Sequence, residues 1–216
     1  MAKAETFGAE RGLDRFEGFT DAVFAIAITL LIVELKAPGT PQGPPEPHGL
    51  ARALMDEWRG YLGLVVSFVL IGIYWLQHHY SGRIYRKSDH VFGLANLVFL
   101  FGIMFAPYPL RTWAEHIGQG EDERIASAFA AFGLFLPALG WLLKWFYGVP
   151  GKRLIDERLD PSFLRTLGRQ YTVTTLVLAL SVPLALVWPR LGLGIAFLVT
   201  LAYALPPRKP RYVDAN

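Results

Sequence analysis

Long apolar runs recur along the chain, separated by short segments rich in proline, glycine and charged residues. A helix needs about 20 mostly apolar residues to cross the hydrocarbon core of a bilayer. On this criterion the pattern predicts six membrane-spanning helices, at roughly 16–35, 61–77, 91–108, 125–145, 171–188 and 191–205. The last run is short, and polar residues interrupt the second and third, so five spans are the alternative count.

The segments between the predicted spans are too short for a soluble domain. We therefore expect residues 1–216 to form a single all-α transmembrane domain. The connecting segment 152–170 alternates charged residues with Leu, Ile and Phe. This alternation fits an amphipathic helix at the membrane surface as well as it fits a solvated connector.

The composition agrees with a membrane protein, because 53% of the residues are hydrophobic, 14% are aromatic and the mean hydropathy is +0.33. The chain has no cysteine, which excludes disulfides and thiolate chemistry. It also has no G-x-S-x-G elbow, H-E-x-x-H helix or G-x-x-x-x-G-K-[ST] loop. The common hydrolase and ATPase chemistries therefore have no residues to use, and we do not expect an enzyme.

Lysine and arginine near the ends of membrane helices favour the cytoplasmic side. With an even number of spans and both chain ends in the cytoplasm, the inner segments hold 15 of the 21 basic residues and the outer segments hold 6. Lys144 counts among the inner ones, and the proline-rich segment 37–49 falls outside. The pattern predicts an N-in, C-in topology. The net charge of +3 then faces anionic lipid, and no nucleic-acid partner is expected.

The first predicted span carries an apolar stripe. At about 100° per residue, one side of the helix collects Phe19, Ala22, Ile26, Thr29, Leu30 and Val33. Ala25 and Ala27 flank this stripe, and small residues let helices approach closely in lipid. Copies of the helix around an axis would present apolar rings and one hydroxyl, and apolar rings can gate ions by dewetting. The alternative is a stripe that faces lipid or the core of the bundle.

Asp21 lies near the start of this span. A charge near membrane depth is costly, so it normally pairs or faces a wet cavity. Alternatively, Thr20 is the N-cap and Asp21 is the first helical residue, where a carboxylate interacts favourably with the helix dipole. This alternative shortens the helix to about 16 residues, or roughly 24 Å. It also leaves the preceding mixture of charged and aromatic residues unexplained.

Three motifs resemble those of one channel family. The sequence R-x-x-x-F-T-D at the head of the first span is formed by Arg15, Phe19, Thr20 and Asp21. It resembles the R-x-x-x-F-S-D signature of the potassium channels called transmembrane protein 175. The family's W-x-x-H-H is matched by Trp75, His78 and His79, and its N-L-x-F-L and closing proline are matched by Asn96 and Pro107. The resemblance covers roughly residues 13–109.

This resemblance implies six helices per subunit and a bacterial-type homotetramer in the cell membrane. It also implies a pore lined by the first helix, with K⁺ as the permeant ion, no cofactor and no T-V-G-Y-G filter, a segment that this sequence also lacks. In the family the narrowest apolar ring lies five residues after the signature aspartate. The corresponding residue here is Ile26, and the further lining positions are Thr29, Leu30 and Val33.

The resemblance further implies a structural network that holds the pore helix in one rotation through polar contacts with neighbouring helices. Its expected members are Arg15, Phe19, Thr20, Asp21, Trp75, His78, His79 and Asn96. The two adjacent histidines diverge by about 100° on a helix, so we do not expect a metal site there.

The favoured hypothesis is a passive potassium-permeable channel. The alternative is a proton-coupled secondary transporter that uses Asp21 and the histidine pair as a relay, which predicts saturable, proton-coupled flux. A multi-pass membrane enzyme or a structural membrane protein would show no flux.

Overall fold

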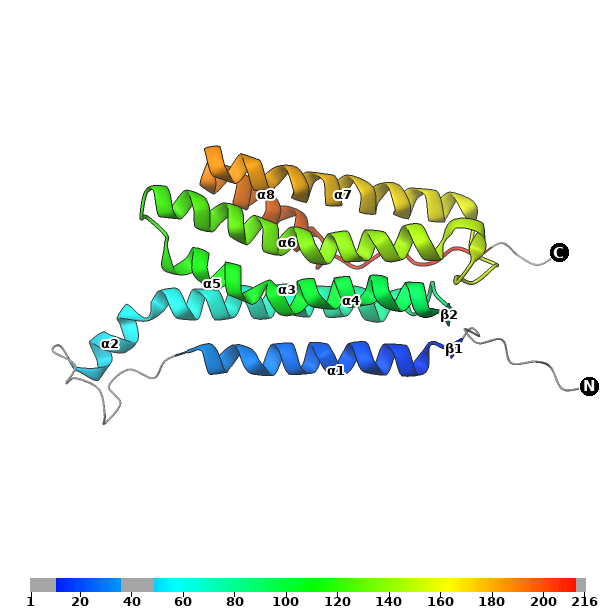
Figure 1. Cartoon of the computed structure of the whole chain (residues 1–216), viewed down its shortest axis with the longest axis horizontal. Helices are drawn as coiled ribbons and strands as arrows, with labels where there is room; N and C mark the ends of the chain where they lie inside the picture. The colour runs from blue at the N-terminus through cyan, green and yellow to red at the C-terminus, as the bar shows by residue number, and fades with distance from the viewer. Residues whose placement is uncertain (1–10, 36–48, 213–216) are drawn as a thin grey trace, which may run out of the picture.

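The computed structural model describes residues 11–35 and 49–212, so most of the proline-rich segment 37–49 lies outside the described residues. The long helices run side by side in one bundle (Figure 1). In chain order the elements are β1 (Arg11–Gly12), α1 (Asp14–Leu30), the 3₁₀ turn η1 (Leu31–Glu34), α2 (Leu50–Asp56), α3 (Trp58–Ser81), β2 (Lys87–Ser88), α4 (His90–Phe105), α5 (Pro107–Glu115), α6 (Glu121–Gly148), the 3₁₀ turn η2 (Pro150–Lys152), α7 (Pro161–Val187) and α8 (Pro189–Ala202).

The prediction of a largely helical membrane protein is confirmed. Within the described residues, 5 stretches are long and apolar enough to cross a membrane, at 14–33, 58–81, 90–115, 121–148 and 161–187. The predicted sixth span is present as α8, but it has only 14 residues. At 1.5 Å per residue this is about 21 Å, short of the roughly 30 Å hydrocarbon core. The two-residue strands β1 and β2 pair antiparallel and are a small departure from an all-α fold.

The fifth span begins earlier than predicted, at Pro161 rather than near residue 171. Asp160 caps α7, because its carboxylate accepts a hydrogen bond of 2.7 Å from the backbone nitrogen of Ser162, and Pro161 occupies the first turn. The second half of segment 152–170 is therefore part of α7. That half is an amphipathic helical turn, with Phe163, Leu164 and Leu167 buried and Arg165 and Arg169 exposed, so the interpretation as a connector is wrong for it.

Helices α4 and α6 pack closely because glycines face the contact. A Cβ added at Gly140 would overlap the backbone of Phe99, and one added at Gly102 would lie 2.6 Å from the backbone nitrogen of Pro137. Small residues permit this approach in lipid, where packing drives helix association. The result is a central helix, α6, that contacts α4, α5, α7 and α8.

The structure corrects the place of Lys144 in the charge count. Helix α6 continues to Gly148, so Lys144 lies inside the helix and is only 2% exposed. It therefore belongs to the interior of the bundle and not to a charged collar at the membrane surface.

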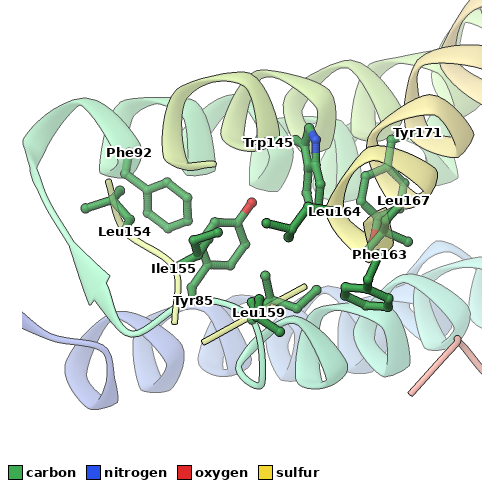
Figure 2. Packing of buried hydrophobic residues seen from close by; sticks show 11 residues of the cluster. Tyr85, Phe92, Trp145, Leu154, Ile155, Leu159, Phe163, Leu164, Leu167 and Tyr171 are labelled. Atoms are coloured by element: carbon green, nitrogen blue, oxygen red, sulfur yellow. The ribbon is translucent and has the colours of Figure 1, made fainter. Parts of the chain in front are cut away.

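The end of the bundle that carries β1, β2 and both ends of the described chain has its own apolar core (Figure 1). Tyr85 packs between residues of the α6–α7 connection and residues of α4, α6 and α7 (Figure 2). Two arginines bind the carboxylate of Asp156 beside this core, Arg158 at 2.8 Å and Arg86 at 3.1 Å. Segment 152–160 is thus fixed to the bundle rather than loosely connected.

We predict that Gly140→Ala destabilises the protein. The added methyl group meets the backbone of α4, and overpacking of this kind costs about 1–3 kcal/mol. The measurement is the midpoint of thermal unfolding in detergent. Gly72→Ala is the matched control, because nothing lies within 4 Å of its added Cβ. Equal midpoints for the two variants would contradict the close packing of α4 on α6.

We also predict that Asp156→Asn lowers stability in a pH-dependent way. Arg158 and Arg86 hold the pKa of Asp156 well below its usual range. A carboxylate with a depressed folded-state pKa stabilises the fold above its unfolded pKa of about 3.9, and this contribution is lost as the pH falls further. The difference in melting midpoint between parent and Asp156→Asn should therefore be constant near neutrality and shrink below about pH 4. Glu157→Gln, at an exposed neighbouring position, should show no such difference.

Candidate functional site

Helix α1 lies at the edge of the bundle, next to α3 and α4 (Figure 1). It is the least buried of the five candidate spans. Of its 18-residue apolar stretch 17% is buried, against 39%, 39%, 50% and 28% for the other four spans in chain order. The buried side of α1 carries Thr20 at 0% exposure and Phe24 at 1%. One face is therefore fixed to the subunit, and the other is left uncovered.

The helix begins at Asp14, with Leu13 in the N-cap position. Thr20 and Asp21 consequently lie inside the helix, and the interpretation of Thr20 as an N-cap is wrong. Two acidic residues, Asp14 and Glu17, occupy the first turn, where negative charge interacts favourably with the helix dipole. The resulting span of 20 residues is about 30 Å long and matches the thickness of a bilayer core.

The candidate pore-lining residues all lie on the uncovered face. Ile26 is 57% exposed, Leu30 is 56% exposed and Val33 is 73% exposed, and Thr29 is also exposed. The Thr29 hydroxyl bonds back to the carbonyls of its own helix, Ala25 and Ile26, each at 3.0 Å. Val33 lies in η1, so the spacing of about 100° per residue used for the stripe ends at Leu30.

A groove lies between the C-terminal half of α1 and its neighbours. It has a volume of about 340 Å³ and runs from Ile26 and Leu30 to Gly60 and Gly63 of α3. The small residues on α3 leave this space beside the stripe. The exposed stripe of α1 therefore borders an open groove rather than a packed interface.

Polar side chains from two helices bind the N-terminal half of α1. The Asn96 side-chain nitrogen, Nδ2, in α4 donates to the Thr20 hydroxyl at 2.9 Å. The Thr20 hydroxyl in turn donates to the backbone carbonyl of Phe16 at 3.0 Å. From α3, the Trp75 indole nitrogen donates to the Asp21 carboxylate at 3.1 Å. The structure thus pairs Thr20 with Asn96 and Asp21 with Trp75.

The two histidines separate. His78 is 3% exposed and packs against Phe24 and Phe99, with ring centroids 6.0 Å and 6.4 Å away. Its Nδ1 is buried and has no hydrogen-bond partner among the described residues. His79 is exposed and stacks on Trp75 with a centroid distance of 6.0 Å. In the described part of the chain, no group of three or more potential ligands could hold a metal ion.

The remaining two candidates stand apart from these contacts. The Arg15 side chain is exposed and forms no hydrogen bond or ion pair with any other described residue. Phe19 is 54% exposed and lies on the uncovered face with Ile26. The structure therefore does not join Arg15 or Phe19 to the polar contacts in a single subunit.

Lys144 also belongs to this site, although no sequence motif indicates it. The Lys144 Nζ in α6 donates to the Asn96 side-chain oxygen at 2.8 Å. The available signal was a single lysine between Trp141 and Trp145 in an otherwise apolar run. Hydropathy places such a lysine at a membrane boundary and does not detect its burial.

A family model described as the endosomal/lysosomal potassium channel TMEM175 matches residues 15–107. A potassium channel from Streptomyces collinus is 33% identical over 189 residues, which cover 88% of this chain and 90% of that protein. The chain belongs to the TMEM175 family of potassium channels. A second TMEM175-like relative, a potassium channel from Chamaesiphon minutus, is 30% identical over 88% of this chain and 93% of its own length.

The likeness to TMEM175 proteins extends beyond the three motifs. A crystal structure of a Chamaesiphon minutus homologue of the lysosomal potassium-selective channel TMEM175 superimposes with a TM-score of 0.73 at 27% identity. The match covers 89% of this chain and 96% of that one. The second half of the chain, which carries no motif, therefore shares the TMEM175 fold. The TMEM175 family is one of channels and not of enzymes.

We predict that Thr20→Val destabilises the protein whereas Thr20→Ser does not. Valine keeps the volume of threonine but leaves the Asn96 side-chain nitrogen without an acceptor, at a cost of about 1–3 kcal/mol. Serine keeps the oxygen and is the residue of the TMEM175 signature. The melting midpoints of the two variants in detergent are the measurement, and equal midpoints would show that the hydroxyl does not contribute.

Proposed function

We propose that the protein is a potassium-permeable cation channel of the cell membrane, assembled as a homotetramer with α1 of each subunit around the central axis. Each subunit is one six-helix domain, with α8 as the sixth helix and both chain ends in the cytoplasm. Conduction is passive, so K⁺ moves down its electrochemical gradient. No cofactor takes part, and the bilayer is the other partner.

The observation that carries this proposal is the two-sided environment of α1. Its Thr20 and Asp21 side bonds to α4 and α3, whereas Ile26 and Leu30 are more than half exposed. A polar anchor on one face fixes the rotation of a helix in lipid. The exposed stripe is then aimed in one direction, as a helix that lines a shared axis requires.

The conduction path follows from the residues on that stripe. Stacked rings of Ile26, Leu30 and Val33 are apolar and offer a permeating ion no ligand. Narrow apolar rings exclude water and ions, and the same rings conduct once they widen enough to admit water. Selectivity then comes from ring dimensions and residual hydration, with the hydroxyl of Thr29 as the polar contribution. No T-V-G-Y-G filter is needed for this mechanism.

The proposed orientation is supported by charge and by the positions of the chain ends. With Lys144 removed from the inner count of 15, the division of basic residues is 14 inside and 6 outside. Strand β1 pairs with β2, and Tyr212 pairs with Leu159, all at one end of the bundle (Figure 1). Both described ends therefore lie on one side, as an even number of crossings requires.

We predict that Ile26→Asn increases passive K⁺ flux from liposomes that contain the purified protein. An amide in the apolar ring lowers the cost of wetting it, so the closed state becomes leaky. The measurement is K⁺ flux per reconstituted protein, with Na⁺ and H⁺ gradients imposed in parallel.

The matched control is Ile32→Asn, because Ile32 is also exposed, at 59%, but lies outside the stripe. Equal increases in K⁺ flux from both variants would show that the pore does not lie on the Ile26 face of α1. K⁺ flux that saturates and requires a proton gradient would instead support the transporter hypothesis. Absence of flux from the parent and from Ile26→Asn would reject conduction through α1.

A further inference from the structure

Lys144 is a buried cation that neither the family motifs nor the proposed conduction path uses. It is 2% exposed inside α6. An ammonium in an apolar interior is unfavourable unless its protons and its charge are satisfied. Among the described residues it forms no ion pair, and its hydrogen bond to Asn96 satisfies one of three donors.

Aromatic rings and the negative charge of Glu17 in α1 supply further stabilisation. The ammonium nitrogen lies 5.0 Å from the ring centre of Phe99, 5.1 Å from Trp141, 5.4 Å from Phe92 and 5.6 Å from Phe16. A ring face attracts a cation most strongly when water is excluded. These rings belong to α1, α4 and α6. Lys144 therefore lies where the candidate pore helix meets the central part of the bundle.

The hydrogen bonds that start at Lys144 run in one direction only. An ammonium donates and cannot accept, so Asn96 must turn its amide oxygen toward Lys144. Its amide nitrogen then faces Thr20 and donates at 2.9 Å. The Thr20 hydroxyl accepts this bond and donates its own hydrogen bond to the Phe16 carbonyl at 3.0 Å. Without a fixed donor on α6, the Asn96 amide is free to turn over. The Thr20 hydroxyl would then donate to the amide oxygen of Asn96 and give up its bond to the Phe16 carbonyl.

We infer that Lys144 is a positioning residue for the permeation path. It sets the amide orientation of Asn96, and through Asn96 and Thr20 it fixes the rotation of α1. This inference rests on the proposed function, because the rotation matters only if α1 lines the pore. Lys144 acts through other residues and does not contact the permeating ion.

The weak packing of α1 gives this hydrogen-bond chain its influence. Only 17% of the 18-residue apolar stretch of α1 is buried, and the groove of about 340 Å³ adjoins the C-terminal half of this helix. A rotation by one residue, about 100°, would replace Ile26 by Ala25 on the axis. Apolar contacts in such a helix resist that rotation weakly, so directional polar bonds decide it.

The experiment measures the rotation directly. The chain has no cysteine, so Ile26→Cys and Ala25→Cys each introduce a single thiol. A charged, water-soluble methanethiosulfonate reagent reports which thiol faces the pore, through the rate at which K⁺ flux is blocked. In the parent background we expect Cys at position 26 to react faster than Cys at position 25. In the Lys144→Met background we expect this rate ratio to fall about tenfold, equivalent to about 1.4 kcal/mol.

Three further variants show which role Lys144 has. Lys152→Met removes an exposed lysine in η2 and should leave the ratio unchanged. Thr20→Val breaks the hydrogen-bond chain at its end on α1 and should lower the ratio as Lys144→Met does, whereas Thr20→Ser should preserve it.

If Lys144→Met does not assemble, Lys144→Gln replaces it. The shorter, uncharged glutamine can both donate and accept, so it no longer dictates how Asn96 is turned, and the ratio should again fall.

The outcomes separate the two proposals. A parent channel in which neither thiol affects flux would reject the proposed pore on α1. A pore-facing thiol at position 26 with an unchanged ratio in the folded Lys144 variant would overturn the positioning role. A lower melting midpoint of that variant together with an unchanged ratio would show that Lys144 only packs the core, which also overturns the inference.

Discussion

The core of a bilayer offers no water to polar side chains, so each buried polar group must find its partner within the protein. The arrangement of this subunit depends on how that requirement is met at Thr20, Asn96 and Lys144. All three are nearly inaccessible, and each bonds to the next. Their bonds join α1 to α4 and α4 to α6. The helix with the least apolar burial is thus tied to the helix with the most.

The rest of the bundle is stabilised in a different way. Glycines let α4 and α6 approach closely, and α7 and α8 pack on the opposite side of α6. An apolar core closes the end that carries β1 and β2 (Figure 2). The subunit therefore combines a firmly packed body with one loosely packed helix. Local opening is easiest where few apolar contacts are made, so α1 is the helix of this bundle most easily displaced.

Membership of the TMEM175 family connects these contacts with potassium conduction. This chain has threonine where the family signature has serine, and the structure shows why the exchange is compatible. The side-chain hydroxyl at position 20 accepts a hydrogen bond from Asn96 and donates one to the Phe16 carbonyl. Threonine and serine both carry a hydroxyl that can do this. The likeness in fold also covers the second half of the chain, where no motif is present. Packing of apolar helices therefore maintains the fold where individual residues have diverged.

The sequence alone determined the membrane class, the approximate position of each span and the polar residues at the head of α1. These features are local, because hydropathy sums over neighbouring residues and helical periodicity relates positions a few residues apart. The early start of α7 also had a local signal in the pair Asp160 and Pro161. Tertiary structure alone decided the burial of Lys144 and which of the two adjacent histidines is buried. Those outcomes depend on which helix faces which, as Thr20 and Asn96 illustrate, which lie 76 positions apart in the sequence and are bonded in the fold. No sum over neighbouring residues contains that information.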